Sequence, residues 1–300
     1  MTLADLEALA PEWEALWQRD RRATPFQSPA WLIPWTRHLW GGGELIIQED
    51  RINGELSGLL PLFRWGTDQT TVSFLGAGVS DYGDILGSFR QISLPEDAIL
   101  EEIPESSPFC LTGPRPVGSI EQCSACPILT LADYPSKLNP KLKLDLHRAS
   151  NKLARHNPRF TQPTNPDAFF LLHAKRWNAE PNPTLEAFQR EAAQGFARRN
   201  LLRLHLLEID STPAAALFAI AAHGTLYCYL SAFDPQFTKL SPGALLLAHV
   251  IESAQSEGLT AVDFLRGTES YKYLWGAVDR PTYRVRPCRR TAESKEPPRS

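Results

Sequence analysis

Apolar positions in this chain of 300 residues follow first a helical and then a strand-like spacing, and the same order occurs in both halves. Helical spacing is present in residues 3–21, 29–40, 167–179 and 184–199, and the strand-like apolar segments are residues 44–48, 56–63, 70–75, 202–209, 214–221 and 226–232. A hairpin turn signal, Asn53-Gly54, separates the first two strand-like segments. This repeated order predicts an α/β (α+β) fold with two units in tandem, each a mixed, mainly antiparallel sheet flanked by helices.

The middle and the end of the chain deviate from this pattern. Residues 86–127 are rich in Pro, Ser and Glu, with one strand expected around residues 109–111. Residues 289–300 are polar, contain two adjacent prolines and are predicted to be disordered. We therefore expect one unit in residues 1–130 and a second unit in residues 131–288.

Residues 136–155 form a basic stretch that is predicted to be helical. Its basic residues are Lys137, Lys141, Lys143, Arg148, Lys152 and Arg155. Such a stretch could contact an anionic ligand, for example the phosphates of a cofactor. The alternative is a helix face in water, which is the commoner role of a run of charges.

Composition and charge exclude several classes of protein. With 43% hydrophobic and 22% charged residues, the chain can bury one large or two modest cores. The net charge of −3 creates no overall basic field, so no nucleic-acid partner is expected. No apolar run approaches the roughly 20 residues of a membrane helix, and acidic residues close to Met1 do not fit a signal peptide. We expect no membrane span and a cytoplasmic location, and the sequence indicates no oligomeric state.

The five cysteines are typical of a reduced protein rather than of a disulfide framework. Cys123 and Cys126 form a Cys-x-x-Cys pair, but no second pair with metal-ligand spacing follows it. Pro127 leads into an apolar, strand-like run, whereas a thioredoxin-type motif would lead into a helix. The seven histidines are scattered without ligand spacing, so no metal site is predicted.

One segment near the end of the chain concentrates charged and aromatic residues. Residues 263–275 read Asp-Phe-Leu-Arg-Gly-Thr-Glu-Ser-Tyr-Lys-Tyr-Leu-Trp, where an apolar strand breaks at Gly267 and four polar side chains follow closely. The segment resembles the signature of the CelD-like branch of the GNAT superfamily, the acetyltransferases first linked to bacterial cellulose biosynthesis. In that family a strand leads into Gly-x-Glu-x-Tyr-Lys and an aromatic residue, and each of these elements is present here.

Further segments resemble the same family in the same order. They are residues 24–31, 58–62, 74–76, 80–82, 175–177, 232–234 and 241–246. The resemblance covers residues 24 to 285 and implies tandem GNAT-like units. It also implies an N-acyltransferase that moves an acyl group, expected to be acetyl, from acyl-CoA to an amine. The implied acceptor is a small molecule, an amino sugar or a peptide-like compound, as in exopolysaccharide or envelope metabolism.

The cofactor residues are expected at the start of a helix. Ser241 and a following proline are a helix-start signal, and the run 244–256 is apolar at helical spacing. A helix N-terminus offers unpaired N–H groups to an anion, and GNAT proteins bind the CoA pyrophosphate at this junction. The resemblance therefore assigns Ser241, Gly243, Ala244 and Leu245 to acetyl-CoA or another acyl-CoA. An ordinary capped core helix is the alternative.

The chain departs from the superfamily at this place, because the usual Gly-rich loop is missing. The departure leaves two other functions open. Tandem GNAT proteins also include enzymes that take an aminoacyl group from a charged tRNA. The chain could instead be a catalytically silent GNAT-like protein that binds a ligand or a partner.

Acyl transfer to an amine requires a proton acceptor and a donor to the oxyanion. Asp81, Glu269 and Tyr271 are the catalytic candidates. Asp81 matches the Asp-Tyr pair of the family, and its alternative role is to cap a turn between glycines. Glu269 could instead form a local ion pair with Lys272, and Asp263, a further candidate base, could cap a loop inside the fold.

The candidate substrate-binding residues are Tyr82, Trp177, Arg266 and Lys272. The planar guanidinium of Arg266 suits an acceptor carboxylate or phosphate. Trp177 could flank the acceptor, although an aromatic side chain is more often part of a core. If these residues share one site, residues 80–82 must lie close to residues 266–272.

Overall fold

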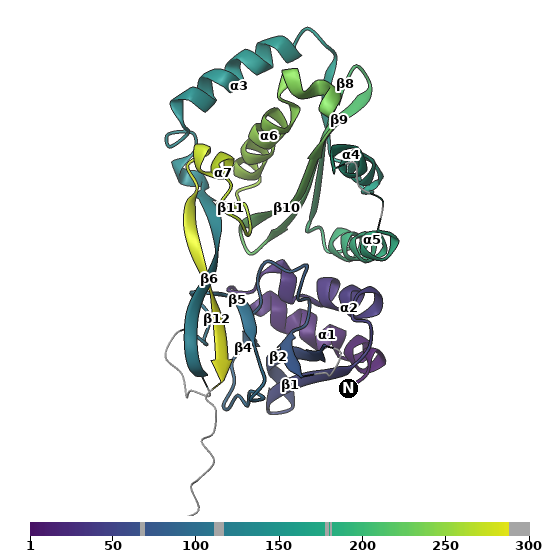
Figure 1. Ribbon diagram of the computed structural model, residues 1–300, viewed down its shortest axis with the longest axis vertical. Helices are drawn as coiled ribbons and strands as arrows, with labels where there is room; N and C mark the ends of the chain where they lie inside the picture. Colours follow the sequence, from purple (N-terminus) through teal and green to yellow (C-terminus); the bar gives the residue numbers. More distant parts are fainter. Residues whose placement is uncertain (67–69, 111–116, 178–179, 181, 288–300) are drawn as a thin grey trace, which may run out of the picture.

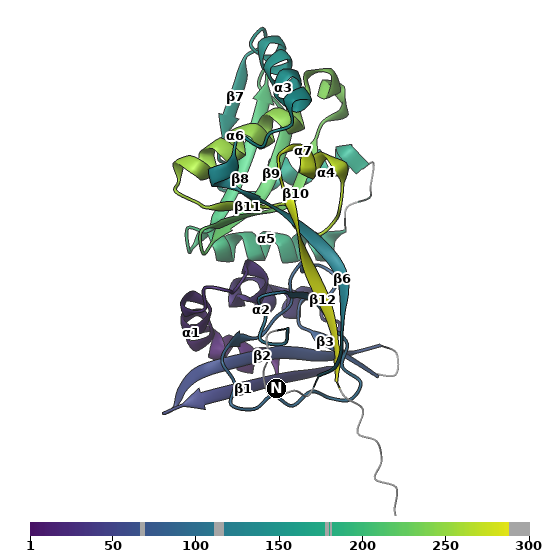
Figure 2. The same ribbon diagram turned by 90° about the vertical axis from the view of Figure 1, so that its left-hand side faces the viewer.

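The computed structural model describes residues 1–66, 70–110, 117–177, 180 and 182–287. Figures 1 and 2 show two lobes, one with α1, α2 and a small sheet and the other with α3 to α7 and most of a large sheet. The helices are α1 (Leu3–Arg19), α2 (Pro29–His38), α3 (Pro140–Leu153), α4 (Asp167–Trp177), α5 (Pro183–Ala197), α6 (Pro242–Ser256) and α7 (Ser270–Leu274). The strands are β1 (Glu44–Ile52), β2 (Glu55–Trp65), β3 (Thr71–Phe74), β4 (Leu86–Gly87), β5 (Leu100–Pro104), β6 (Val117–Thr130), β7 (Pro158–Thr161), β8 (Leu202–Ile209), β9 (Thr212–Ala222), β10 (Thr225–Phe233), β11 (Ala261–Asp263) and β12 (Val278–Pro287).

The small sheet has the order β1-β2-β3, with β4 pairing β2, and all its pairs are antiparallel. Asn53 and Gly54 connect β1 to β2 with φ values of 53° and 88°, the left-handed conformation that an Asn-Gly turn predicts. Helix α1 buries residues at helical spacing, among them Leu6, Leu9 and Trp13. The predicted helices and hairpin of the first half are therefore present.

The large sheet has eight strands in the order β5-β12-β6-β11-β10-β9-β8-β7. Helix α6 packs on one face of β8, β9 and β10, and α4 packs on the other face of β9 and β10 (Figure 1). Both faces of β9 are thus covered, and its sequence is Thr-Pro-Ala-Ala-Ala-Leu-Phe-Ala-Ile-Ala-Ala, in which nine of the eleven residues are buried. Helix α5 joins the lobes, because Gly195 lies against Ala30 of α2 and leaves little room for a side chain.

Two neighbouring strands of the large sheet diverge from each other and form a fork. Strand β10 pairs with β11 in parallel over only three residues, from Thr225 to Tyr227. Beyond that point β10 stays with β9, whereas the chain after β11 follows β6, with hydrogen bonds from the Phe264 N–H to the Pro127 carbonyl (2.9 Å) and from the Gly267 N–H to the Ala125 carbonyl (3.1 Å). A β-bulge at Tyr229 shifts the register of β10 where the fork opens.

The predicted fold class is confirmed, since both sheets are mainly antiparallel and are flanked by helices. Helices α1 and α2 precede the small sheet, and α4 and α5 precede the strands β8, β9 and β10 of the large sheet. Three details differ from the sequence-based expectation. The strand expected around residues 109–111 is wrong, because residues 105–110 form turns and the strand is β5. The end of β6 after Pro127 was expected to be strand-like, but the full length of β6 and the strand β12 were not foreseen. Among the described residues no helix lies between β3 and β6, so the repeat is partial. Residues 289–300, expected to be a disordered tail, lie outside the described residues.

Candidate active site

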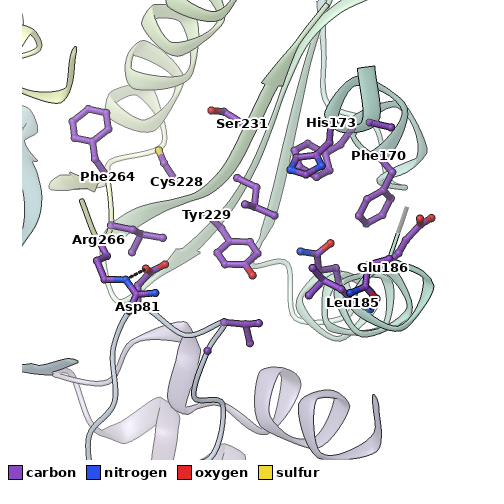
Figure 3. Close-up of a pocket in the computed structure, with 18 of the residues that line it drawn as sticks. Asp81, Phe170, His173, Leu185, Glu186, Cys228, Tyr229, Ser231, Phe264 and Arg266 are labelled. Carbon is purple, nitrogen blue, oxygen red and sulfur yellow. Dashed lines mark hydrogen bonds and ion pairs between the residues drawn. The ribbon is translucent and has the colours of Figure 1, made fainter. Parts of the chain in front are cut away.

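The fork opens into a cavity of about 610 Å³, here named the central cavity. Its lining comes from four parts of the chain: residues 78–81 of the first lobe, helix α4 with the start of α5, strand β10, and residues 264–272. Figure 3 shows Asp81 and Arg266 on one side of Tyr229, with Glu186 and Phe170 on the other side. The cavity therefore collects polar side chains from segments that are far apart in the sequence.

Asp81 and Arg266 meet at the junction of the two lobes. The Asp81 carboxylate lies 3.4 Å from the Arg266 guanidinium, which also lies 3.2 Å from the Glu102 carboxylate. Burial raises the pKa of Asp81 to about 6, and the charge of Arg266 offsets part of this rise. A carboxyl group with this pKa can accept a proton near neutral pH, which suits a general base.

Tyr82 and Asp263 form a second contact between the lobes. The Tyr82 hydroxyl donates to the Asp263 carboxylate at 2.8 Å, and both residues are buried. Asp263 also accepts from the N–H of Leu265 at 2.8 Å, where the backbone has a left-handed φ of 59°. Asp263 therefore caps the loop after β11, as its alternative role predicted, and Tyr82 is part of the core.

Lys272 is buried beneath the same loop. Its ammonium donates to the carbonyls of Leu265, Arg266 and Gly267, each at 3.0 Å, and lies 2.8 Å from the Glu269 carboxylate. Four acceptors surround a group that has only three protons to donate. The structure thus gives Lys272 the role of holding the loop, and the predicted local ion pair with Glu269 is present.

Glu269 and Tyr271 reach the cavity from the start of α7. Burial acts to raise the pKa of Glu269, but the ion pair with Lys272 outweighs it, and the net pKa is lowered. Glu269 is therefore a weaker base than Asp81. Tyr271 is 46% exposed, and burial of its hydroxyl together with the charge of Glu269 raises its pKa to about 12. At neutral pH the Tyr271 hydroxyl keeps its proton and can donate it.

A second cavity of about 520 Å³, here named the apolar groove, lies on the α6 side of the fork. Its lining includes Phe233, Gly243, Leu246, Leu274 and Trp275. Five residues line both cavities: Cys228, Ser231, Phe264, Glu269 and Tyr271. The apolar groove and the central cavity therefore meet at the fork, where a ligand in one would touch a ligand in the other.

The N-terminus of α6 borders the apolar groove, and the predicted helix start is present. Pro242 is the first helical residue, and Ser241 precedes it with a left-handed φ of 52°. The Ser241 side chain makes no capping hydrogen bond, so the expected serine cap is wrong. Pro242 has no N–H and the Leu245 N–H donates to the Ser241 carbonyl, so Gly243 and Ala244 supply the N–H groups at this end of the helix. Gly243 and Ala244 line the groove, whereas Leu245 is buried in the core.

The predicted proximity of residues 80–82 and 266–272 is present in the structure. Asp81, Arg266, Glu269, Tyr271 and Lys272 line one cavity. Trp177 is the last residue of α4, and its side chain lies outside the described part of the chain.

Sequence reasoning missed the residues that β10 contributes, Cys228, Tyr229 and Ser231. Their place at the fork depends on the bulge and on the divergence of two strands, which leave no mark in the sequence pattern. Burial raises the pKa of Cys228 to about 12, so its thiol stays protonated and is no nucleophile at neutral pH.

Asp84 is a further buried carboxyl group, which accepts from the Ser107 hydroxyl at 2.6 Å and from the Ile85 N–H at 2.8 Å. Burial raises its pKa to about 7, above the ordinary 3.8. The folded state therefore binds the proton more tightly than the unfolded state, and the ionised group destabilises the fold increasingly as the pH rises from about 4 to 7.

We expect Asp84→Asn, which keeps both hydrogen bonds without the charge, to increase the free energy of unfolding at pH 8 by about 1–3 kcal/mol. At pH 4.5 the gain should be only about a quarter as large, because this pH is only slightly above the ordinary pKa of 3.8. Urea denaturation at the two pH values measures this, with Asp145→Asn on the exposed face of α3 as the control. Equal effects of Asp84→Asn at both pH values would contradict the assignment.

The described residues contain neither a cluster of metal ligands nor a membrane-spanning helix. No three His, Cys, Asp or Glu side chains within the described ranges lie together so that they could hold a metal ion. Among the helices of the described part, none is long and apolar enough to cross a membrane.

Comparison with solved structures shows which fold the chain has. The C-terminal domain (DUF2156) of a lysylphosphatidylglycerol synthetase from Agrobacterium fabrum is similar, with a TM-score of 0.61 and 11% identity over 95% of this chain and 92% of that chain. L-PGS from Bacillus licheniformis has a TM-score of 0.62 and 11% identity over 93% and 92%. FemX has a TM-score of 0.62 and 8% identity over 92% and 95%. At such low identity these likenesses show the fold alone.

The sequence also matches a family model. No curated protein matches the chain. Residues 140–273, which contain α3 to α7, match the family described as an acetyltransferase (GNAT) domain. This match confirms the prediction of a transferase of the GNAT superfamily, and the CelD-like branch stays a prediction.

Proposed function

We propose that the protein transfers an acyl group, which we expect to be acetyl, from acyl-CoA to the amine of an acceptor bound in the central cavity. The observation that carries this proposal is the meeting of two cavities at the fork, through the five residues that line both. A donor in one and an acceptor in the other would place the thioester beside the amine. The acceptor is a small molecule, an amino sugar or a peptide-like compound, and the location is cytoplasmic.

The apolar groove fits the acyl donor for three reasons. Beyond Tyr227, the edge of β10 that faces the fork is no longer paired with β11. Its peptide groups can therefore pair with the extended, amide-containing arm of an acyl donor such as acyl-CoA. The groove is lined by apolar side chains such as Leu246, Leu247 and Phe264. The free N–H groups at the start of α6 suit the pyrophosphate.

The chemistry follows from the protonation states of the polar side chains. The amine nitrogen attacks the thioester carbonyl, the new C–N bond forms, and the C–S bond breaks. Asp81 accepts the proton of the amine, because its pKa is about 6, whereas the lowered pKa of Glu269 makes that group the weaker base. The Tyr271 hydroxyl keeps its proton and donates a hydrogen bond to the departing thiolate, which then takes its proton from water, and Asp81 returns the proton of the amine to water. Arg266 holds Asp81 in place through their ion pair.

An aminoacyl group from a charged tRNA is the second candidate donor. The name lysylphosphatidylglycerol synthetase, carried by a structure with a similar fold, states that a lysyl group is joined to a lipid. Helix α3 also borders the apolar groove through Leu142, and it carries Lys141, Lys143 and Lys152, for which the structure shows no ion pairs. A catalytically silent, ligand-binding protein is the third possibility.

We expect Gly243→Glu to weaken the binding of CoA and acetyl-CoA by at least ~10-fold, because it brings a carboxylate to the proposed phosphate site. A Cβ at Gly243 meets nothing closer than the Phe233 ring at 3.6 Å, so the fold tolerates a side chain. Isothermal titration calorimetry measures the affinity, and the neutral variant Gly243→Gln is the matched control.

Equal CoA affinity in the parent, Gly243→Glu and Gly243→Gln would place the donor elsewhere. Binding of a charged tRNA with no binding of any acyl-CoA would instead support the second candidate.

A further inference from the structure

The charged side chains of the central cavity restrict the acceptor more narrowly than the proposed function does. Resting on that function, we propose that the acceptor is an amine without carboxylate or phosphate groups and with an aromatic or aliphatic body. The argument depends on which charges of the cavity are free to meet a ligand.

Both cationic side chains of the described lining already face acidic or carbonyl oxygens of the protein. They are Arg266 and Lys272. Arg266 faces the carboxylates of Asp81 and Glu102 at 3.4 and 3.2 Å, and Glu102 is itself fixed by hydrogen bonds from Ser124 and Thr282. The ammonium of Lys272 has four acceptors and is buried beneath the loop. An acidic acceptor would have to displace Asp81 or Glu102 from Arg266, so in this inference Arg266 does not take the expected role of holding an acceptor carboxylate or phosphate.

Carboxylates outnumber these two cations in the lining. Four acidic residues line the cavity, namely Asp81, Glu180, Glu186 and Glu269. Arg190 pairs with Glu186 at 2.7 Å from outside the lining, whereas Glu180 forms no ion pair within the described part of the chain. His173 adds no positive charge, since burial lowers its pKa. The cavity is therefore negative and favours a ligand that is neutral or cationic apart from its reacting amine.

The remaining wall of the cavity is aromatic. Phe169, Phe170 and Tyr229 line it, and Figure 3 shows Tyr229 between Asp81 and the α5 side of the cavity. Arg190 stacks on Phe170 at 4.6 Å, which fixes that ring. Aromatic faces attract apolar bodies and ammonium groups alike. A volume of about 610 Å³ accommodates such an amine in full.

Matched pairs of amines test the inference directly. Tyramine and tyrosine, tryptamine and tryptophan, and cadaverine and lysine each differ only by one carboxylate. We expect kcat/KM with acetyl-CoA to be roughly 30-fold higher for the member without the carboxylate, as for two like charges ~8 Å apart at an effective dielectric of ~20. Equal or lower values for these members would overturn the inference.

Binding of the same pairs, measured by calorimetry without donor, separates this inference from the proposed function. If no amine is acylated but the non-acidic members bind more tightly, the proposed function fails and the acceptor inference stands. The acceptor inference is overturned if the acidic members bind more tightly. It is also overturned if no member binds at about 10 mM, which is roughly the weakest affinity expected for a small ligand.

A charge-reversal variant gives a second measurement. Glu180→Lys introduces a free cation at the exposed rim of the cavity, and we expect it to reduce the preference for the non-acidic amine by at least ~5-fold. The control is Glu55→Lys, which makes the same charge change at the exposed β1–β2 turn. An unchanged preference in Glu180→Lys would show that charge in the cavity does not select the acceptor.

Discussion

Replacement of Asp81 by Asn should lower kcat by roughly 10²- to 10⁴-fold, with the affinity for acyl-CoA unchanged. The side chain keeps its shape, but it loses its ability to accept a proton and its charge opposite Arg266. Because burial raises the pKa of Asp81 to about 6, the parent should lose activity as the pH falls through 6 and the carboxylate becomes protonated. Steady-state kinetics between pH 5 and 9, with an amine identified by the paired screen, measure both effects.

Glu269→Gln is the comparison variant for this experiment. The ion pair with Lys272 lowers the pKa of Glu269 despite its burial, so this group contributes little as a base, and kcat should fall by less than ~10-fold. The activity that remains in Asp81→Asn should lack the pH dependence near 6. If Glu269→Gln shows the larger loss, or if Asp81→Asn keeps full turnover, the proton is accepted by another group.

Replacement of Lys272 by Met should decrease the free energy of unfolding by about 3–5 kcal/mol. Methionine fills a similar volume, but the carbonyls of residues 265–267 lose their donor and Glu269 loses its cation. Since Lys272 is only 3% exposed, water cannot replace the ammonium without opening the loop. Urea denaturation followed by tryptophan fluorescence measures the loss.

Lys239→Met is the matched control for Lys272→Met, because Lys239 is exposed at the end of the 3₁₀ segment Pro235–Leu240 and should change stability by less than ~0.5 kcal/mol. If the Lys272→Met protein is as stable as the parent, Lys272 does not hold the loop, and its expected role as a substrate ligand is favoured.

The sequence predicted the elements whose signal is local. The strand boundaries of β8 agree with the pattern at residues 202–209, and the Asn53-Gly54 turn has the predicted left-handed backbone. Strand β12 and the part of β6 before Pro127 were missed because their alternation is weak and their partners are distant: β6 pairs with both β11 and β12, whose residues lie more than a hundred positions later. Such long-range pairing leaves no local signal.

The sequence analysis named residues that the structure brings together in the candidate site, but it assigned their roles less well. Asp81 was named from a family resemblance and Arg266 from the chemistry of its guanidinium, and the structure brings them together. Arg266 faces two carboxylates, and Lys272 donates to three carbonyls. Both arrangements depend on tertiary contacts, which the spacing of residues in the sequence does not predict. The bulge at Tyr229, which opens the fork, is equally invisible in the alternation of β10.

The position of β12 between β5 and β6 imposes an order on biosynthesis. Strand β6 ends at Thr130, whereas β12 begins at Val278, so a ribosome adding about 5–20 residues per second completes β6 roughly 7 to 30 seconds before its neighbour exists. During that interval β5 and β6 expose unpaired peptide groups to other nascent chains. A fragment ending near residue 130 should therefore keep these unpaired strand edges and aggregate. Synthesis of the full chain should benefit from a chaperone that covers the edges of β5 and β6 until β12 is made.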